Sequence, residues 1–195
     1  MSQTLTKLTG KGLAPLQPLL KLPEAAAAAV QGCRLATEAL DRLEAGGFLM
    51  EAARLLAHAL PRREAVWWTC MCASHTEPPD LPEADRSARA AAEQWVRQPN
   101  DQNRIAAKQQ SDATGQSTPE SWAAMAVFFC GESITPEGQP KVPPKPHIAG
   151  RTLGGAVVLA AVRTDPKRQQ DRLRQFLESG RSIAAGGVGR LEHEQ

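Results

Sequence analysis

The chain has 195 residues, of which 42% are hydrophobic and 23% are charged, as in an ordinary globular protein. Its 23 basic and 21 acidic residues leave a formal net charge of +2, which excludes the strongly basic surface of a typical nucleic-acid-binding protein. No apolar run approaches the roughly 20 residues that span a bilayer, and the N-terminus lacks the apolar core of a secretory signal. We therefore expect a cytoplasmic protein that does not enter a membrane.

Composition favours helices over strands. Tyrosine is absent, phenylalanine is sparse, alanine is abundant and β-branched runs are few. The chain is long enough for one domain and short for two. We predict an all-α, single-domain protein of about seven or eight helices, arranged as an irregular bundle or a short stack of helical hairpins. Its expected parts are an extended arm over residues 1–22, a helical domain over residues 23–185 and a flexible tail over residues 186–195.

The first half of the domain reads as a helical hairpin followed by an apolar helix. We predict one helix from Pro23 to the Gly46–Gly47 stop, and a second from Phe48 to Leu60. The short connection between them predicts antiparallel packing. Pro61 then opens a helix that ends before the prolines at 78 and 79 and carries an almost unbroken apolar run.

The second half contains two further apolar stretches. After a helix over 80–98 and a polar, peripheral segment over 100–113, Thr118 is a candidate N-cap for an apolar helix that runs to Cys130. The segment 131–146 holds five prolines and should be extended and stiff. The apolar helix over 147–163 contains glycines that allow a neighbouring helix to approach closely. We expect the apolar helices around Trp68, Trp122 and Val157 to form the centre of the fold.

The basic residues of the last helix do not indicate nucleic-acid binding. Acidic residues interrupt the cluster, so the pattern favours a solvated helix face. The cluster consists of Lys167, Arg168, Arg172 and Arg174.

Cysteine and histidine are potential metal ligands. Cys70, Cys72 and His75 lie close in sequence, but helical residues two apart point to nearly opposite sides, so the two thiols cannot face one ion. We interpret them, with Cys130, as buried thiols and predict no metal and no cofactor. No nucleophile elbow or phosphate-binding loop is present, and we assign no catalytic residue.

Surface tryptophans and the proline-rich loop are the best candidates for a contact with another protein. The adjacent rings of Trp67 and Trp68 point about 100° apart on a helix, so one can fill the core while the other lies nearer an edge. The apolar residues around them favour the interpretation that both are core residues, and the interpretation that one lies at an edge stays open. The candidate contact surface consists of Trp67, Trp68, Trp95, Pro143, Pro144 and His147.

Three stretches resemble a family of uncharacterised bacterial proteins of similar size, often encoded among type VI secretion genes. They are Leu60–Cys70 (LPRREAVWWTC), Trp122–Phe129 (WAAMAVFF) and Pro143–His147 (PPKPH). The resemblance covers roughly residues 23–180 and supplies no catalytic residues. It implies a cytoplasmic accessory protein that acts as an adaptor or chaperone for a secreted effector or for the secretion spike.

The functional expectation is therefore a non-enzymatic interaction protein whose partner is another protein. Two alternatives remain open: an immunity protein that binds a cognate toxin, and a helical ligand-binding domain or enzyme that uses His58, His75 or His147 beside a pocket. The sequence leaves the oligomeric state open.

Overall fold

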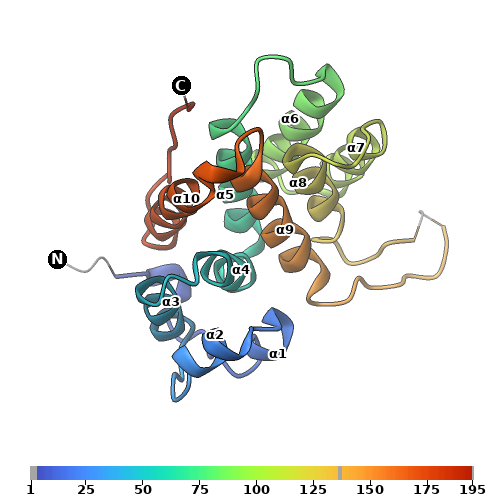
Figure 1. The fold of residues 1–195 in the computed structure, drawn as a ribbon. Helices are drawn as coiled ribbons and strands as arrows, with labels where there is room; N and C mark the ends of the chain where they lie inside the picture. Colours follow the sequence, from blue (N-terminus) through green and yellow to red (C-terminus); the bar gives the residue numbers. More distant parts are fainter. Residues whose placement is uncertain (1–3, 136–137, 195) are drawn as a thin grey trace.

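The computed structural model describes residues 4–135 and 138–194, and this part of the chain is all-α (Figure 1). It contains ten α-helices, two short 3₁₀-helices and no β-strand, so the predicted fold class is confirmed. The α-helices are α1 (Gln17–Leu20), α2 (Glu24–Ala29), α3 (Ala36–Ala45), α4 (Leu49–Ala59), α5 (Arg62–His75), α6 (Glu83–Arg97), α7 (Asp101–Asp112), α8 (Pro119–Phe128), α9 (Ile148–Val162) and α10 (Gln169–Ala184). The 3₁₀-helices are η1 (Thr6–Leu8) and η2 (Pro166–Arg168).

The three apolar helices form the centre of the molecule, as predicted. Helices α5, α8 and α9 all contact one another, and α9 also packs on α4 and α10. Trp68 of α5 and Val157 of α9 are fully buried. The indole N–H of Trp68 donates to the carbonyl of Phe176 on α10 at 2.7 Å, so the largest buried side chain keeps its polar atom paired.

Glycine allows α9 to lie close to its neighbours. A Cβ added at Gly155 would overlap the indole of Trp122 on α8, and one added at Gly154 would touch the backbone of Arg54 on α4. The predicted role of these glycines in close helix approach is therefore confirmed.

The single helix predicted between residues 23 and 46 is two helices in the structure. Helix α2 ends at Ala29, and the chain turns before α3 begins at Ala36. Gly32 in this turn has φ +81°, a left-handed conformation that ends a helix. The prediction was wrong here because the alanine-rich pattern continues on both sides of the turn.

The N-terminal segment is less extended than expected. It contains η1 and α1, and the backbone of Gly12 pairs with that of Leu35 in an isolated bridge. Leu8 and Leu13 are 2% exposed and belong to the same hydrophobic core as the helices that follow. This segment is a packed layer beside α3 and α4.

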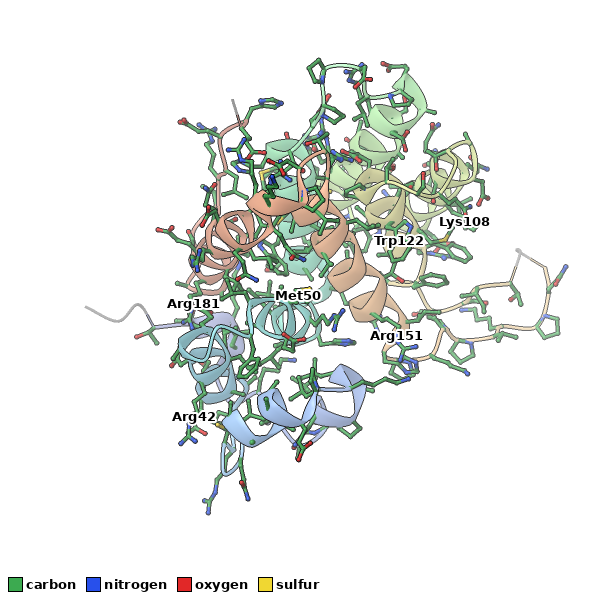
Figure 2. All side chains as sticks on the ribbon, in the orientation of Figure 1. Arg42, Met50, Lys108, Trp122, Arg151 and Arg181 are labelled. Carbon is green, nitrogen blue, oxygen red and sulfur yellow. The ribbon has the colours of Figure 1, made fainter. Side chains whose placement is uncertain are left out.

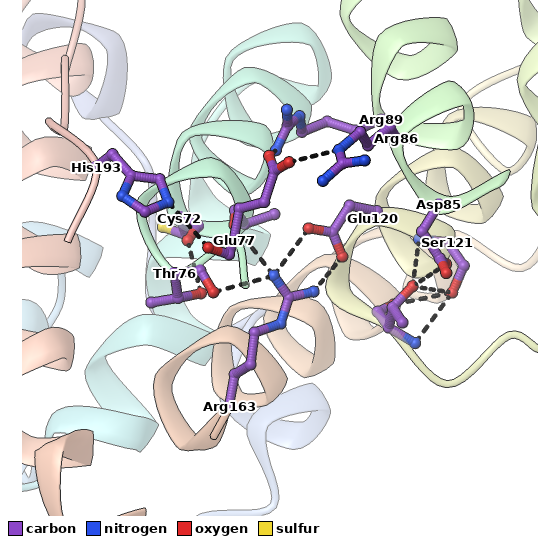
Figure 3. A network of polar contacts seen from close by, with 12 residues as sticks. Cys72, Thr76, Glu77, Asp85, Arg86, Arg89, Glu120, Ser121, Arg163 and His193 are labelled. Atoms are coloured by element: carbon purple, nitrogen blue, oxygen red, sulfur yellow. Dashed lines mark hydrogen bonds and ion pairs between the residues drawn. The ribbon is translucent and has the colours of Figure 1, made fainter. Parts of the chain in front are cut away.

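A polar layer joins α5, α6, α8 and α9 (Figure 3). Arg163, at the end of α9, forms an ion pair with Glu120 of α8 and donates to the carbonyl of Thr76 after α5. Nearby, the carboxylate of Glu77 accepts from Arg86 at 2.8 Å and from Arg89 at 2.5 Å. Burial raises the pKa of Glu77, but the two guanidinium groups outweigh it and hold that pKa below its usual value.

The C-terminal segment differs from the expected flexible tail. Residues Gly187–Glu194, here called the strap, run back along α10 towards the end of α5 (Figure 1). Glu194 pairs with Arg168 and with Arg172, which is 3% exposed. Arg172 was expected on a solvated face and is instead buried, because this carboxylate and three backbone carbonyls surround its guanidinium.

Candidate functional site

The structure separates the four tryptophan and histidine candidates. Trp68 is fully buried and Trp95 is 8% exposed, so neither presents a broad surface to a partner. Trp67 is half-buried, and its indole N–H donates to the carbonyl of Val188 in the strap at 2.9 Å. Trp67 therefore anchors a segment of this chain, while His147 lies half-buried at the start of α9.

The proline-rich loop forms an arm that projects from the body of the protein (Figure 1). The arm comprises residues 131–135 and 138–146 of the described chain. Its two sides are paired: the amide of Ile134 donates to the carbonyl of Val142 at 2.9 Å, and the Thr135 hydroxyl donates to the carbonyl of Pro140 at 2.9 Å. The arm is thus a short hairpin-like extension without helix or strand in its described residues, and its predicted stiffness stays a prediction.

The side chains on the arm are unusually apolar for a solvated loop. Ile134 is 39% exposed and Val142 is 46% exposed, and they are two of the four exposed large hydrophobic residues in the described chain. Pro143 is exposed and Pro144 is half-buried. Exposed apolar residues that lie together mark surfaces that contact other molecules.

The arm is held firmly where it leaves α8. Arg104 of α7 donates to the carbonyl of Phe128 at 3.0 Å and lies 5.0 Å from the centre of the Phe128 ring. The same guanidinium pairs with Asp101 at 2.6 Å and fills the space where Gly131 would otherwise carry a Cβ. Arg62 of α5 donates to the carbonyl of Cys130 at 3.0 Å. These contacts hold the base of the arm against α5 and α7.

The other end of the arm meets a cluster of basic side chains. Figure 2 shows Arg151 where the arm returns to α9. His58 of α4 lies against Gly150, and burial, followed by the neighbouring His147 and Arg151, lowers the pKa of His58. The neutral form of His58 is therefore favoured where the arm meets α9.

An open groove of about 1190 Å³ runs between the arm and α7. Trp95 lies in its wall together with residues of the arm, but the other predicted contact residues, Pro143, Pro144 and His147 among them, do not line it. Its remaining walls include Ile105 and carry charges of both signs, among them Asp101 and Lys141. The mixture of apolar and paired polar groups suits a segment of another protein.

The third histidine, His75, lies elsewhere. It is 7% exposed at the end of α5, contacts the ring of Phe176 edge-on and lines a cavity of about 490 Å³ beneath the strap. Its Nδ1 donates to the carbonyl of Glu192. His75 and His147 therefore belong to different parts of the molecule.

Sequence reasoning missed three parts of this site. Ile134 and Val142 are isolated apolar residues in a polar loop, and their pairing across the arm depends on tertiary structure. The burial of Arg104 was also missed, because the peripheral α7 is polar overall. The signal that could have found it is the aromatic pair Phe128–Phe129 at the end of α8, which offers a face to a cation.

The thiols occupy positions that separate them chemically. Cys70 and Cys72 are fully buried, and burial raises the pKa of each thiol. Cys33 and Cys130 are half-buried, and all four are free thiols.

In the described ranges, 4–135 and 138–194, no helix is long and apolar enough to cross a membrane.

Comparison with known proteins identifies a family but no function. No curated protein and no solved structure matches the chain. Residues 39–184 match a family of unknown function, DUF6931, which covers α4 to α10 and most of α3. The chain therefore belongs to the DUF6931 family.

Proposed function

We propose that this chain is a non-catalytic protein that binds another protein through the arm and the groove beside it. The observation that carries the proposal is the arm itself, which is anchored by Arg104 and Arg62 and exposes Ile134 and Val142. Exposed apolar side chains on an extension whose base is anchored lose less conformational entropy on binding than those on a free loop.

The groove supports the same proposal. It offers the edge of Trp95 and the stem of Lys141 along one continuous surface beside the arm. Aromatic side chains such as Trp95 are enriched at protein contacts, where a buried apolar centre is surrounded by polar groups such as Lys141. An extended segment of a partner protein fits between the arm and α7.

The placement of ionisable groups supports a non-catalytic role. Glu120 pairs with Arg163, Glu77 with two arginines and Glu194 with Arg172, so these buried or half-buried charges neutralise one another within the fold. The groove between the arm and α7 is lined by Asp101 and Arg104, which also pair with each other. Catalytic groups are typically convergent and poised, whereas these groups fix structure.

The cellular role we propose is that of a cytoplasmic adaptor or chaperone accessory to type VI secretion, which follows from the resemblance of Leu60–Cys70 and two further stretches. An immunity protein that neutralises one toxin is the first alternative. A ligand-binding role has one supporting observation, the cavity of about 490 Å³ that His75 lines.

Site-specific photo-crosslinking tests the contact surface. A photoreactive amino acid is placed at position 134 or 142 of the full chain in its native cytoplasm, with position 174 on α10 as the exposed control. We expect one discrete partner to crosslink from both arm positions and not from the control. A secretion component as that partner supports the adaptor role, and a toxin that the chain neutralises supports the immunity role.

A double variant provides the matching loss of function. Ile134→Ser with Val142→Ser should abolish the crosslinked complex while changing the free energy of unfolding by less than about 0.5 kcal/mol, because both side chains are exposed. An arm variant that retains full partner binding would show that the contact lies elsewhere.

A further inference from the structure

The strap is held through its backbone at several points, while Leu191 packs against the hydrophobic core and the His193 ring contacts the carbonyl of Glu77. The indole of Trp67 donates to the carbonyl of Val188, and the hydroxyl of Ser179 donates to the carbonyl of Gly189 at 2.5 Å. His75 contacts the strap twice, because its Nδ1 donates to the carbonyl of Glu192 and its own carbonyl accepts from the amide of Glu194 at 2.8 Å. Side chains that hold the backbone of an extended segment do not require one particular sequence.

The end of the strap adds a specific charged contact. Arg172 donates to the carboxylate of Glu194 from Nε at 2.9 Å and from Nη2 at 2.7 Å, and Arg168 pairs with the other oxygen at 2.5 Å. Arg172 is buried and oriented by the carbonyls that end α9, so its fork is already aimed at a carboxylate. Two arginines arranged in this way form a built carboxylate site.

The strap does not fill its site completely. A cavity of about 490 Å³ lies between the strap and α10, lined on the helix side by Gln175, Glu178 and Ser182. The Nε2 atom of His75 is buried and has no hydrogen-bond partner in the described part of the chain. The pocket is open to solvent, whereas a buried polar atom normally has a hydrogen-bond partner, so the free ring nitrogen is the feature that a purely structural segment leaves unexplained.

The link between α10 and the strap, and the position of the strap outside the family domain, both bear on its role. Gly186, with φ +97°, and Gly187 join the strap to α10, so release of the strap requires little change in the helix. The side chains that hold the strap, from Trp67 to Ser179, lie within the range that matches the family, whereas the strap lies beyond residue 184. The receiving surface is thus part of the family domain.

We propose that the surface of α5 and α10 under the strap is a binding site for an extended acidic peptide, and that the strap occupies this site in cis. The ligand has a small residue at the position of Gly189 and a carboxylate at the position of Glu194. A partner protein that carries such a segment displaces the strap. This site lies away from the arm (Figure 1), so the inference is independent of the proposed function.

A full-length variant with a weakened strap makes the site available. Gly189 has φ +60°, and an added Cβ would overlap the side chain of Ile183 and the carbonyl of Ser179. Gly189→Val should therefore release the strap without changing a helix. Hydrogen exchange of the strap amides, read by mass spectrometry, establishes the release, and Glu194→Gln is a second variant that weakens docking without adding bulk.

The probe is a fluorescein-labelled synthetic peptide that carries residues 186–195, and the readout is fluorescence anisotropy. We expect saturable binding to Gly189→Val and binding at least roughly tenfold weaker to the unmodified chain, because a tethered strap competes at a millimolar effective concentration. A peptide with Glu194→Gln should bind more weakly. Arg168→Ala in the released variant should also reduce affinity, since that side chain is half exposed and the core does not depend on it.

The outcomes separate a binding site from a structural strap. Saturable, carboxylate-dependent binding of the peptide to both released variants supports the proposal. Absence of saturable binding to a folded variant whose strap amides exchange rapidly overturns it, because an open site of this design must accept its own segment in trans. Partner crosslinking through the arm is unaffected by either result, so the two proposals fail separately.

Discussion

At the scale of single residues, the stability of this chain depends on how its buried charges are paired. Glu120 is fully buried, and the side chain of Arg163 is 10% exposed. Their ion pair joins α8 to α9, and the Arg163 guanidinium also donates to the carbonyls of Ala73 and Thr76 at 3.3 Å. A buried pair of this kind contributes less through its own attraction than through the cost of leaving one partner alone.

Removal of the Glu120 carboxylate should therefore lower the stability of the fold strongly. We expect Glu120→Gln to lower the free energy of unfolding by about 3–5 kcal/mol, because it leaves the Arg163 charge buried without an anion. Urea-induced unfolding followed by circular dichroism measures the loss. The matched control is Lys141→Ala, which breaks the exposed pair with Glu132 and should cost less than about 1 kcal/mol. Equal losses in the two variants would contradict this account.

Thiol reactivity provides a second prediction at this scale. Burial raises the pKa of Cys130 to about 11, so little thiolate forms there at neutral pH. Cys70 and Cys72 are fully buried as well as raised in pKa. With a thiol-specific alkylating reagent at pH 7.5, we expect modification of Cys33 first, then Cys130, and of the α5 pair only on unfolding. Peptide mapping by mass spectrometry gives the order, and early labelling of Cys70 would contradict it.

At the scale of elements, the strap carries a dependence on pH. Burial raises the pKa of Glu194, but the hydrogen bonds from Arg172 and the charge of Arg168 outweigh it, so the folded pKa lies below the usual 4.5. A carboxylate with a depressed folded pKa stabilises the docked state fully above its unfolded pKa and loses that contribution as pH falls through the folded value.

Docking of the strap should therefore weaken as pH falls below about 4.5, while the helices remain folded over the first part of that range. The amide resonance of Glu194, which is bonded to the carbonyl of His75, reports docking in a nitrogen–proton NMR titration from pH 6 to pH 3. In the Glu194→Gln variant this transition should be absent. A transition of the same midpoint in that variant would assign it to another carboxylate.

The elements also show what sequence can and cannot specify. Helices α5, α8 and α9 were predictable because their apolar runs and their start signals, such as Thr118, are local properties. Helix α8 begins as expected, with the Thr118 side chain accepting from the amide of Ser121 at 3.2 Å. The strap was not predictable, because Gly186 before it, its own two glycines and its charged end resemble a flexible tail. Its docking depends on Arg172, whose partner lies 22 residues away.

In the candidate site, too, the local features were predictable from the sequence, whereas the features that depend on tertiary structure were not. The sequence indicated the arm through its prolines and indicated Trp95 as a contact residue, and the groove brings the two together. Pairing of Ile134 with Val142 and the burial of Arg104 under the arm could not be read locally. Trp68 entered the candidate surface because a helical run of apolar residues does not reveal which face is covered.

At the scale of the whole molecule, the N-terminal segment belongs to the folded unit. Leu8 of η1 is 2% exposed and packs in the same core as α4 and α10. We expect Leu8→Ala to destabilise the entire protein by about 2–5 kcal/mol, as for other buried leucines. Leu35→Ala is the control, because that side chain is 38% exposed. Thermal unfolding by calorimetry compares them, and an unchanged midpoint for Leu8→Ala would mean that this segment is an independent arm.

The hydrogen bond between Trp67 and the strap gives the molecule an internal optical reporter. The chain has four tryptophans and no tyrosine, so its ultraviolet emission comes from indole rings alone. Trp68 and Trp95 are buried, and Trp122 donates to the carbonyl of Gln116, so these three rings keep their surroundings when the strap leaves. Only Trp67 loses a neighbour and gains water. A red shift of the emission at constant helicity therefore reads strap occupancy directly, in the unlabelled protein and on the timescale of a stopped-flow mixing experiment.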